Sequence, residues 1–147
     1  MAGIKELIQN ALDGWVLTIK DNIRKENAWV TGKTGNSLAV VQIDETHWQI
    51  VGCNYFQTLE RGRKGGKVPK GFYYIIKQWA KDKGIVVDNI SRFAYFTARK
   101  IADYGTELFR QGGRTSIYTD VAATGVEQLQ DRMLEIIEIQ IDGIKRD

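Results

Sequence analysis

The chain has 147 residues, of which 43% are hydrophobic and 27% charged, and its net charge is only +3. This is the composition of an ordinary globular domain with a real core, and it excludes a histone-like protein. The single cysteine excludes an internal disulfide. No stretch approaches the roughly twenty apolar residues of a membrane helix, and the N-terminal residues lack a signal-peptide run. We therefore expect one domain, residues 1–147, in a reducing aqueous compartment and without contact to a membrane.

The first half of the chain predicts a helix followed by a hairpin. Apolar residues from Ile4 to Ile23 recur at three- and four-residue steps, which predicts an amphipathic helix roughly from Gly3 to Lys25. Gly14 lies within it, at a cost of about 1 kcal/mol relative to alanine. Two β-type runs, 37–44 and 47–53, then predict an antiparallel hairpin. Because two strands are marginally stable, we expect a third from the segment around Ser116 or from a neighbouring subunit.

The second half predicts helices. A short one is expected over 55–60, and another over 72–83 with Gly84 as its C-terminal cap. A long helix is predicted roughly over 88–109, with Asp88 or Asn89 as N-cap. The last helix is predicted over about 120–144. The expected fold class is α+β: a long N-terminal helix, a small antiparallel hairpin or sheet, and three further helices packed on it.

The last predicted helix is apolar on more than one side. Val126, Leu129 and Met133 belong to one face, which Ile136 and Ile137 extend. Three further isoleucines continue the apolar character around the helix: Ile139, Ile141 and Ile144. A helix that is apolar on two faces must cover two neighbours. The second neighbour is either another part of this chain or another subunit, and we favour a subunit interface at these three isoleucines.

The loop over residues 61–71 carries the strongest sign of function. Its five cations lie within ten residues: Arg61, Arg63, Lys64, Lys67 and Lys70. Four glycines in the same loop predict an irregular, exposed segment. Like charges repel, so folding alone gives no reason to concentrate them. We predict that this basic loop binds a polyanion or an acidic protein face, although many charge runs are only solvated.

Two smaller features complete the candidate contacts. Arg110 and Arg114 flank the Gly112-Gly113 pair and form a second candidate contact loop. Three aromatic residues depart from the apolar helix faces and are candidates for an interface: Tyr74, Tyr95 and Phe96.

Candidate catalytic residues are few. The only histidine, His47, and the only cysteine, Cys53, would lie on the same face of an ideal strand but far apart along it. A chain with one histidine and one cysteine does not predict a structural zinc site. The Gly32-Lys33-Thr34 segment lacks the earlier glycine of a phosphate-binding loop and follows a helix. We expect no enzyme activity, no metal and no cofactor; a hydrolase using Cys53 and His47 is the weakest alternative.

The block from Trp48 to Gly62 resembles the tail-component family of tailed bacteriophages named for the gene 10 product of phage Hong Kong 97. Its strand ends in Gly52-x-Asn54, an aromatic residue (Tyr55) follows, and Glu60 lies just before Gly62. The basic loop, the long first helix and the lead-in 34–38 are also similar to that family, and so is the block 98–114. A Pro-Arg-Pro-Phe-type segment that many members carry after the loop is missing here.

The resemblance implies a structural virion protein that forms a ring at the head–tail junction, as a neck, tail-completion or terminator protein. Implied partners are copies of itself and adjacent portal, connector or tail proteins, with non-specific contact to packaged double-stranded DNA as a further option. The implied location is the virion, after assembly in the cytoplasm of the bacterial host. The basic loop would either face DNA or dock on acidic residues of a neighbouring ring, and we favour docking. The rival hypothesis is a small non-specific nucleic-acid-binding module.

Overall fold

The computed structural model describes the backbone of residues 3–146 and the side chains as far as residue 134. The fold is α+β, as predicted from the sequence. Its elements are, in chain order, α1 (Gly3–Lys25), α2 (Lys33–Asn36), β1 (Ala39–Asp44), β2 (His47–Val51), α3 (Thr58–Arg61), α4 (Phe72–Lys83), α5 (Ile90–Tyr104), α6 (Glu107–Arg110) and α7 (Thr119–Arg146).

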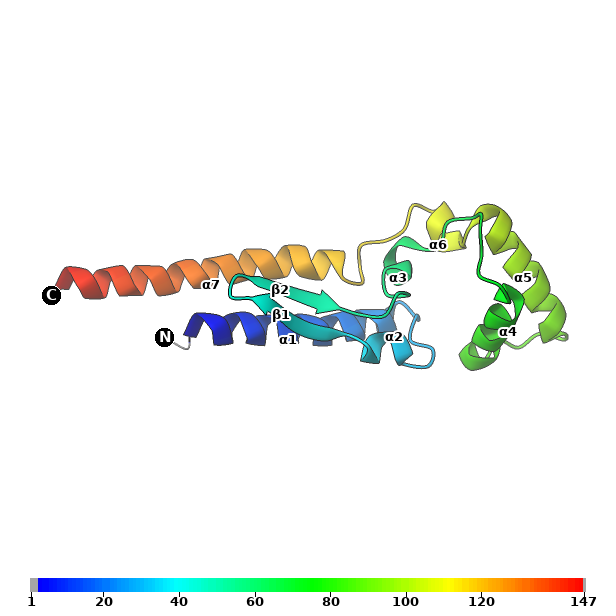
Figure 1. The fold of residues 1–147 in the computed structure, drawn as a ribbon, viewed down its shortest axis with the longest axis horizontal. Coiled ribbons are helices and arrows are strands. Elements are labelled where there is room, and N and C mark those ends of the chain that lie inside the picture. The colour runs from blue at the N-terminus through cyan, green and yellow to red at the C-terminus, as the bar shows by residue number, and fades with distance from the viewer. Residues whose placement is uncertain (1–2, 147) are drawn as a thin grey trace.

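The molecule is elongated, and the two long helices form its body. Helices α1 and α7 lie side by side and run in opposite directions, so that both chain ends lie at the same end of the long axis (Figure 1). The main core lies where α1 meets the hairpin, α3 and the turn before α7. Its buried members are Val16, Ile19, Ile23, Leu38, Leu59 and Ile117. The amphipathic pattern of the first helix thus positions the rest of the body.

The hairpin pairs β1 with β2 in antiparallel register, with Val40 opposite Ile50. Val40 and Ile50 pack against the main core, whereas Val41 and Ile43 are exposed. Within residues 3–146 the sheet has only these two strands. The predicted third strand around Ser116 is wrong for this chain, because residues 114–118 turn into α7 and hydrogen-bond to α1 and α3 instead.

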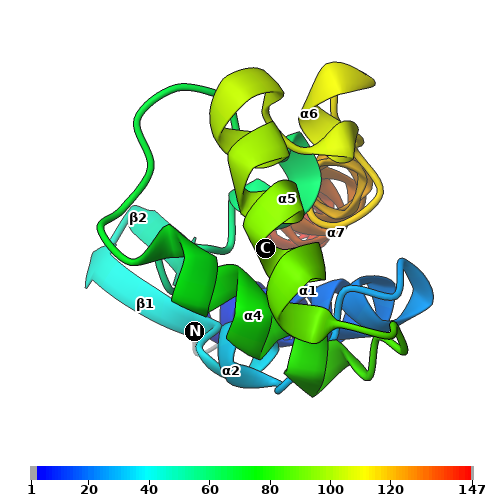
Figure 2. The ribbon, with the colours of Figure 1, turned by 90° about the vertical axis from the view of Figure 1, so that its right-hand side faces the viewer.

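Helices α4 and α5 form a separate helix pair at the end of the molecule opposite both termini (Figures 1 and 2). They pack on each other around Phe72, Ile76, Ala94 and Ala98, which are all buried. The alanines of α5 allow this close approach. The pair therefore has a small core of its own and joins the body through loops rather than lying on the sheet.

Helix boundaries with strong local signals were predicted well. The predictions for α1 and α4 are confirmed at both ends, and Gly84 adopts the left-handed conformation of a C-terminal cap with φ of 76°. Asn89 is the N-cap of α5, since its side-chain oxygen accepts from the Arg92 N–H at 3.1 Å. The single helix predicted over 88–109 is wrong. Gly105, with φ of 82° and ψ of 177°, ends α5, and Thr106 starts α6 as a new N-cap.

Two helical glycines should respond in opposite ways to alanine. A Cβ on Gly14 would meet nothing within 4 Å, so Gly14→Ala should raise the free energy of unfolding by about 0.5–1 kcal/mol through helix propensity. A Cβ on Gly125 would overlap the Trp15 indole across the α1–α7 contact, so Gly125→Ala should lower it by about 1–3 kcal/mol. Urea denaturation of the two variants checks both signs, and equal shifts would contradict the packing described for α7.

Candidate binding surface

The first half of the basic loop is docked rather than freely exposed. The Thr106 N–H donates to the Arg63 carbonyl at 2.9 Å, and the Arg63 N–H donates to the Thr106 hydroxyl at the same distance. The Gly66 N–H donates to the Ala102 carbonyl at 2.6 Å. The glycines that predicted an irregular loop instead allow close approach: a Cβ on Gly62 would overlap the backbone of Phe109. The segment 62–66 is irregular, as predicted, but Gly62, Arg63 and Gly65 are packed and only partly exposed.

The docking separates the five cations into two groups. Four of them are exposed: Arg61, Lys64, Lys67 and Lys70. Arg63 is half-buried, and its guanidinium lies over the Phe72 ring at 5.1 Å. Its Nε is enclosed and has no hydrogen-bond partner among the described residues. Arg63 thus holds the loop against α4, and the other four cations remain available to a partner.

The two arginines of the second candidate loop also differ in exposure. Arg110 is exposed at the end of α6. Arg114 is instead built into the body: its Nε donates to the Leu59 carbonyl at 2.9 Å, and its guanidinium pairs with Glu26 at 3.4 Å. Its backbone N–H also donates to the Glu60 carbonyl at 2.8 Å. Arg114 therefore joins α1, α3 and the segment before α7.

Glu60 has a structural role that the sequence did not predict. It is only 3% exposed, and its carboxylate accepts from the N–H groups of Tyr118 and Thr119 at 2.8 and 3.0 Å and from the Thr119 hydroxyl. These groups start α7, so Glu60 caps that helix from 58 positions away in the chain. Burial, and then the Glu60 charge, raise the pKa of the Tyr118 phenol. The sequence marked Glu60 only as a lone acid before the basic loop and as part of the block 48–62, without indicating that it caps a helix.

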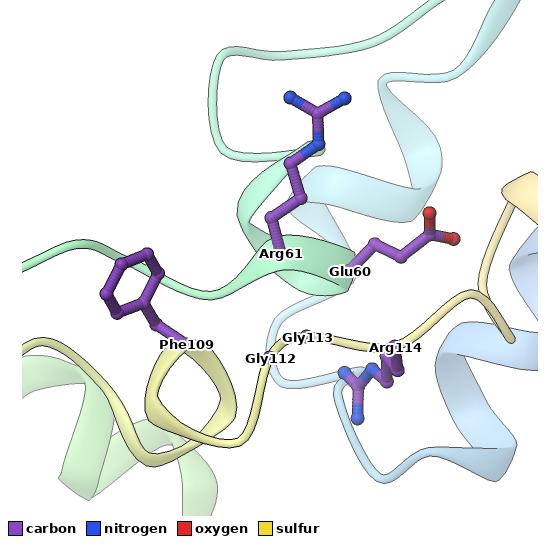
Figure 3. Close-up of a pocket in the computed structure, with 6 residues that line it drawn as sticks. All are labelled: Glu60, Arg61, Phe109, Gly112, Gly113 and Arg114. Carbon is purple, nitrogen blue, oxygen red and sulfur yellow. The ribbon is translucent and has the colours of Figure 1, made fainter.

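A cavity of about 250 Å³ lies where the two loops meet, lined by Glu60, Arg61, Phe109, Gly112, Gly113 and Arg114 (Figure 3). The charged side chains of Glu60, Arg61 and Arg114 point in different directions from it. A small-molecule site would need polar groups that converge. This cavity is therefore a gap between packed backbone segments, and of the four exposed loop cations Arg61 lines it.

The other predicted residues lie in different parts of the molecule. Tyr74, Tyr95 and Phe96 are 71%, 50% and 56% exposed on the α4–α5 pair, as expected for interface candidates. Ile139, Ile141 and Ile144 lie on α7 beyond residue 134, outside the described side chains. His47 starts β2, and Cys53 lies two residues past its end. Burial raises the pKa of the Cys53 thiol, but hydrogen bonds involving Thr34 and Ser37 outweigh this and lower it.

The described residues offer neither a metal site nor a membrane-spanning helix. None of their His, Cys, Asp and Glu side chains gather in a group that could hold a metal ion. Over the same part of the chain, no helix is both long and apolar enough to cross a bilayer.

The arrangement leaves four cations of the basic loop exposed and shows no converging reactive groups in the described part of the chain. Comparison with known proteins gave no family model, curated protein or solved structure that matches this chain.

Proposed function

We propose that the protein is a structural component of a tailed-bacteriophage virion that assembles as a ring at the head–tail junction. The single observation that carries the proposal is the α4–α5 pair. It projects from the body and keeps large apolar side chains exposed, among them Tyr74, Ile75, Tyr95 and Phe96. Large apolar side chains left in solvent on a projecting pair of helices are candidates for a protein-binding surface.

The block that resembles the phage family gives further support. Glu60 caps α7, and Gly62 adopts a φ of 76° against the Phe109 backbone. The acid and the glycine of that block thus have physical roles, which are to hold the last helix and the docked loop. This makes the block part of the architecture of the protein, in keeping with a structural protein.

The test of the proposal is the mass and shape of the assembly. We expect sedimentation and light scattering to give a closed oligomer, and negative-stain images to show a ring with a central opening. Purified particles of the parent phage should contain the chain in a fixed ratio to the portal protein. A chain that stays monomeric at high concentration and is missing from the particles would contradict the proposal.

The exposed loop cations support docking of the ring on an acidic neighbour. A variant with Lys64, Lys67 and Lys70 replaced by alanine should form the ring normally but lose most of its attachment to the adjoining virion component. Co-sedimentation of the purified rings with tails or heads measures this. A matched variant, Lys5→Ala/Lys25→Ala/Lys33→Ala, removes the same charge from exposed sites outside the loop and should attach as the natural chain does.

The same loop variant also tests the rival hypothesis that the protein is a nucleic-acid-binding module. If the loop binds phosphates, the slope of log affinity for duplex DNA against log salt should fall by roughly 0.9 for each phosphate that the variant no longer neutralises. We expect instead that DNA affinity at physiological salt is weak and that the variant changes it little. A steep salt dependence that disappears in the variant would favour the nucleic-acid-binding module.

A further inference from the structure

The charges of this chain are separated along its length. Residues 61–114 contain thirteen lysines and arginines and four acids, a net charge of +9. The rest of the chain contains eight lysines and arginines and fourteen acids, a net charge of −6. The two parts add up to the net charge of +3 for the whole chain. In space, residues 72–110 form the α4–α6 end of the molecule, and α1, the hairpin and α7 form the other (Figure 1). The small net charge of the whole chain is therefore the sum of a strongly positive segment and a negative remainder.

The basic end has few internal partners. Among the side chains that the structure describes, Arg114 is the only cation of residues 61–114 within 4.0 Å of a carboxylate. The cations also alternate with exposed rings along one face of α5, at helical spacing: Arg92, Tyr95, Phe96, Arg99 and Lys100. Arg92 lies over the Phe96 ring at 5.7 Å. This stripe is about 12 Å long and is both apolar and positively charged.

A complementary stripe lies on the outer face of α7. Asp120, Glu127 and Asp131 are exposed there and recur at helical spacing, and Leu134 follows on the same face with 57% of its surface exposed. The opposite face of α7 packs on α1 around Gly125 and Leu129. Residues 115–147 carry three lysines and arginines and seven acids, a net charge of −4. Because α5 lies at one end of the molecule and α7 runs from its middle toward the other end, one chain cannot bring the two stripes together (Figure 1).

We propose that the basic aromatic stripe of α5 docks on the acidic outer face of α7 of a second copy of this chain. The charges are complementary, and Leu134 gives the rings of Tyr95 and Phe96 an apolar partner that a duplex backbone lacks. Such a contact joins two different surfaces, so it repeats head to tail and closes into a ring when the rotation between copies allows it. The inference rests on the proposed function, and it specifies which surfaces meet.

Charge reversal and mixing test this contact. One variant carries Arg99→Glu and Lys100→Glu, and the other carries Glu127→Lys and Asp131→Lys; all four residues are exposed, so thermal unfolding should match the natural chain. We expect each variant alone to assemble at least about tenfold more weakly, because like charges then face each other. An equal mixture should regain assembly, since each contact in an alternating ring joins opposite charges. The matched control is Lys25→Glu/Lys33→Glu, which should assemble as the natural chain does.

The outcomes separate this inference from the proposed function. If the natural chain forms rings and both variants form them equally well alone, the α5–α7 contact is overturned and the ring proposal stands. If both variants are impaired but the mixture does not recover, the two stripes do not face each other, and the contact is again overturned. If the α5 variant keeps its assembly and loses binding to single-stranded or duplex DNA, the stripe binds nucleic acid. A natural chain that is monomeric throughout overturns both proposals.

Discussion

Replacing Glu60 by alanine is expected to lower the free energy of unfolding by about 2–4 kcal/mol. The carboxylate is buried and accepts three hydrogen bonds at the start of α7, two of them from the N–H groups of Tyr118 and Thr119. Hydrogen bonds to a charged group contribute more than neutral ones, and alanine would leave the two N–H groups without their acceptor. Urea denaturation followed by circular dichroism measures the loss.

Two matched variants isolate the cause of that loss. Glu60→Gln keeps one acceptor oxygen but brings an amide N–H₂ toward the same donors, so we expect an intermediate loss of about 1–2 kcal/mol. Glu45→Ala removes an exposed acid from the hairpin turn and should change stability by less than about 0.5 kcal/mol. If Glu60→Ala is as mild as Glu45→Ala, the cap on α7 contributes little to the fold. Because α7 carries the acidic stripe, the Glu60 variant should also weaken assembly.

Replacing Gly105 by alanine is expected to cost about 2–4 kcal/mol and to release the docked half of the basic loop. Gly105 has φ of 82° and ψ of 177°, a conformation almost confined to glycine. Its Cβ would lie 2.6 Å from the Arg63 carbonyl oxygen and 3.0 Å from the Gly65 nitrogen. Backbone strain and overlap therefore add. Hydrogen exchange at the Gly66 and Thr106 N–H groups should become faster than in the natural chain.

The control for Gly105 is Gly84, which has φ of 76° and ψ of 30° and open space around the position of a Cβ. Gly84→Ala adds only the left-handed backbone cost of about 1–2 kcal/mol and should leave exchange in the loop unchanged. Equal losses of unfolding free energy in Gly105→Ala and Gly84→Ala would show that the packing of the loop on Gly105 contributes nothing to stability. A larger loss for Gly105, with faster exchange confined to the loop, is the expected pattern.

The elements with strong local signals were predictable from the sequence because their causes are local. The three- and four-residue apolar spacing predicted α1 and α4 at both ends, Gly84 was identified as a cap, and the N-cap of α5 was narrowed to Asp88 or Asn89. The break at Gly105 was not predicted. A lone glycine inside an apolar pattern is tolerated in many helices, and here the break depends on the Arg63 carbonyl, 43 positions away from Thr106.

The candidate site divides in the same way. Charge and glycine content identified the basic loop, but all five cations looked alike in the sequence. Only the fold shows that Arg63 lies over Phe72 whereas the lysines of the loop are exposed. It also shows that Arg114 is paired with Glu26 whereas Arg110 is exposed. The sequence by itself determined helices α1 and α4, the hairpin and the place of the basic loop, because periodicity and charge are properties of neighbouring residues. The tertiary structure decided which charges are buried and that Glu60 caps α7, because those contacts join segments that only folding brings together.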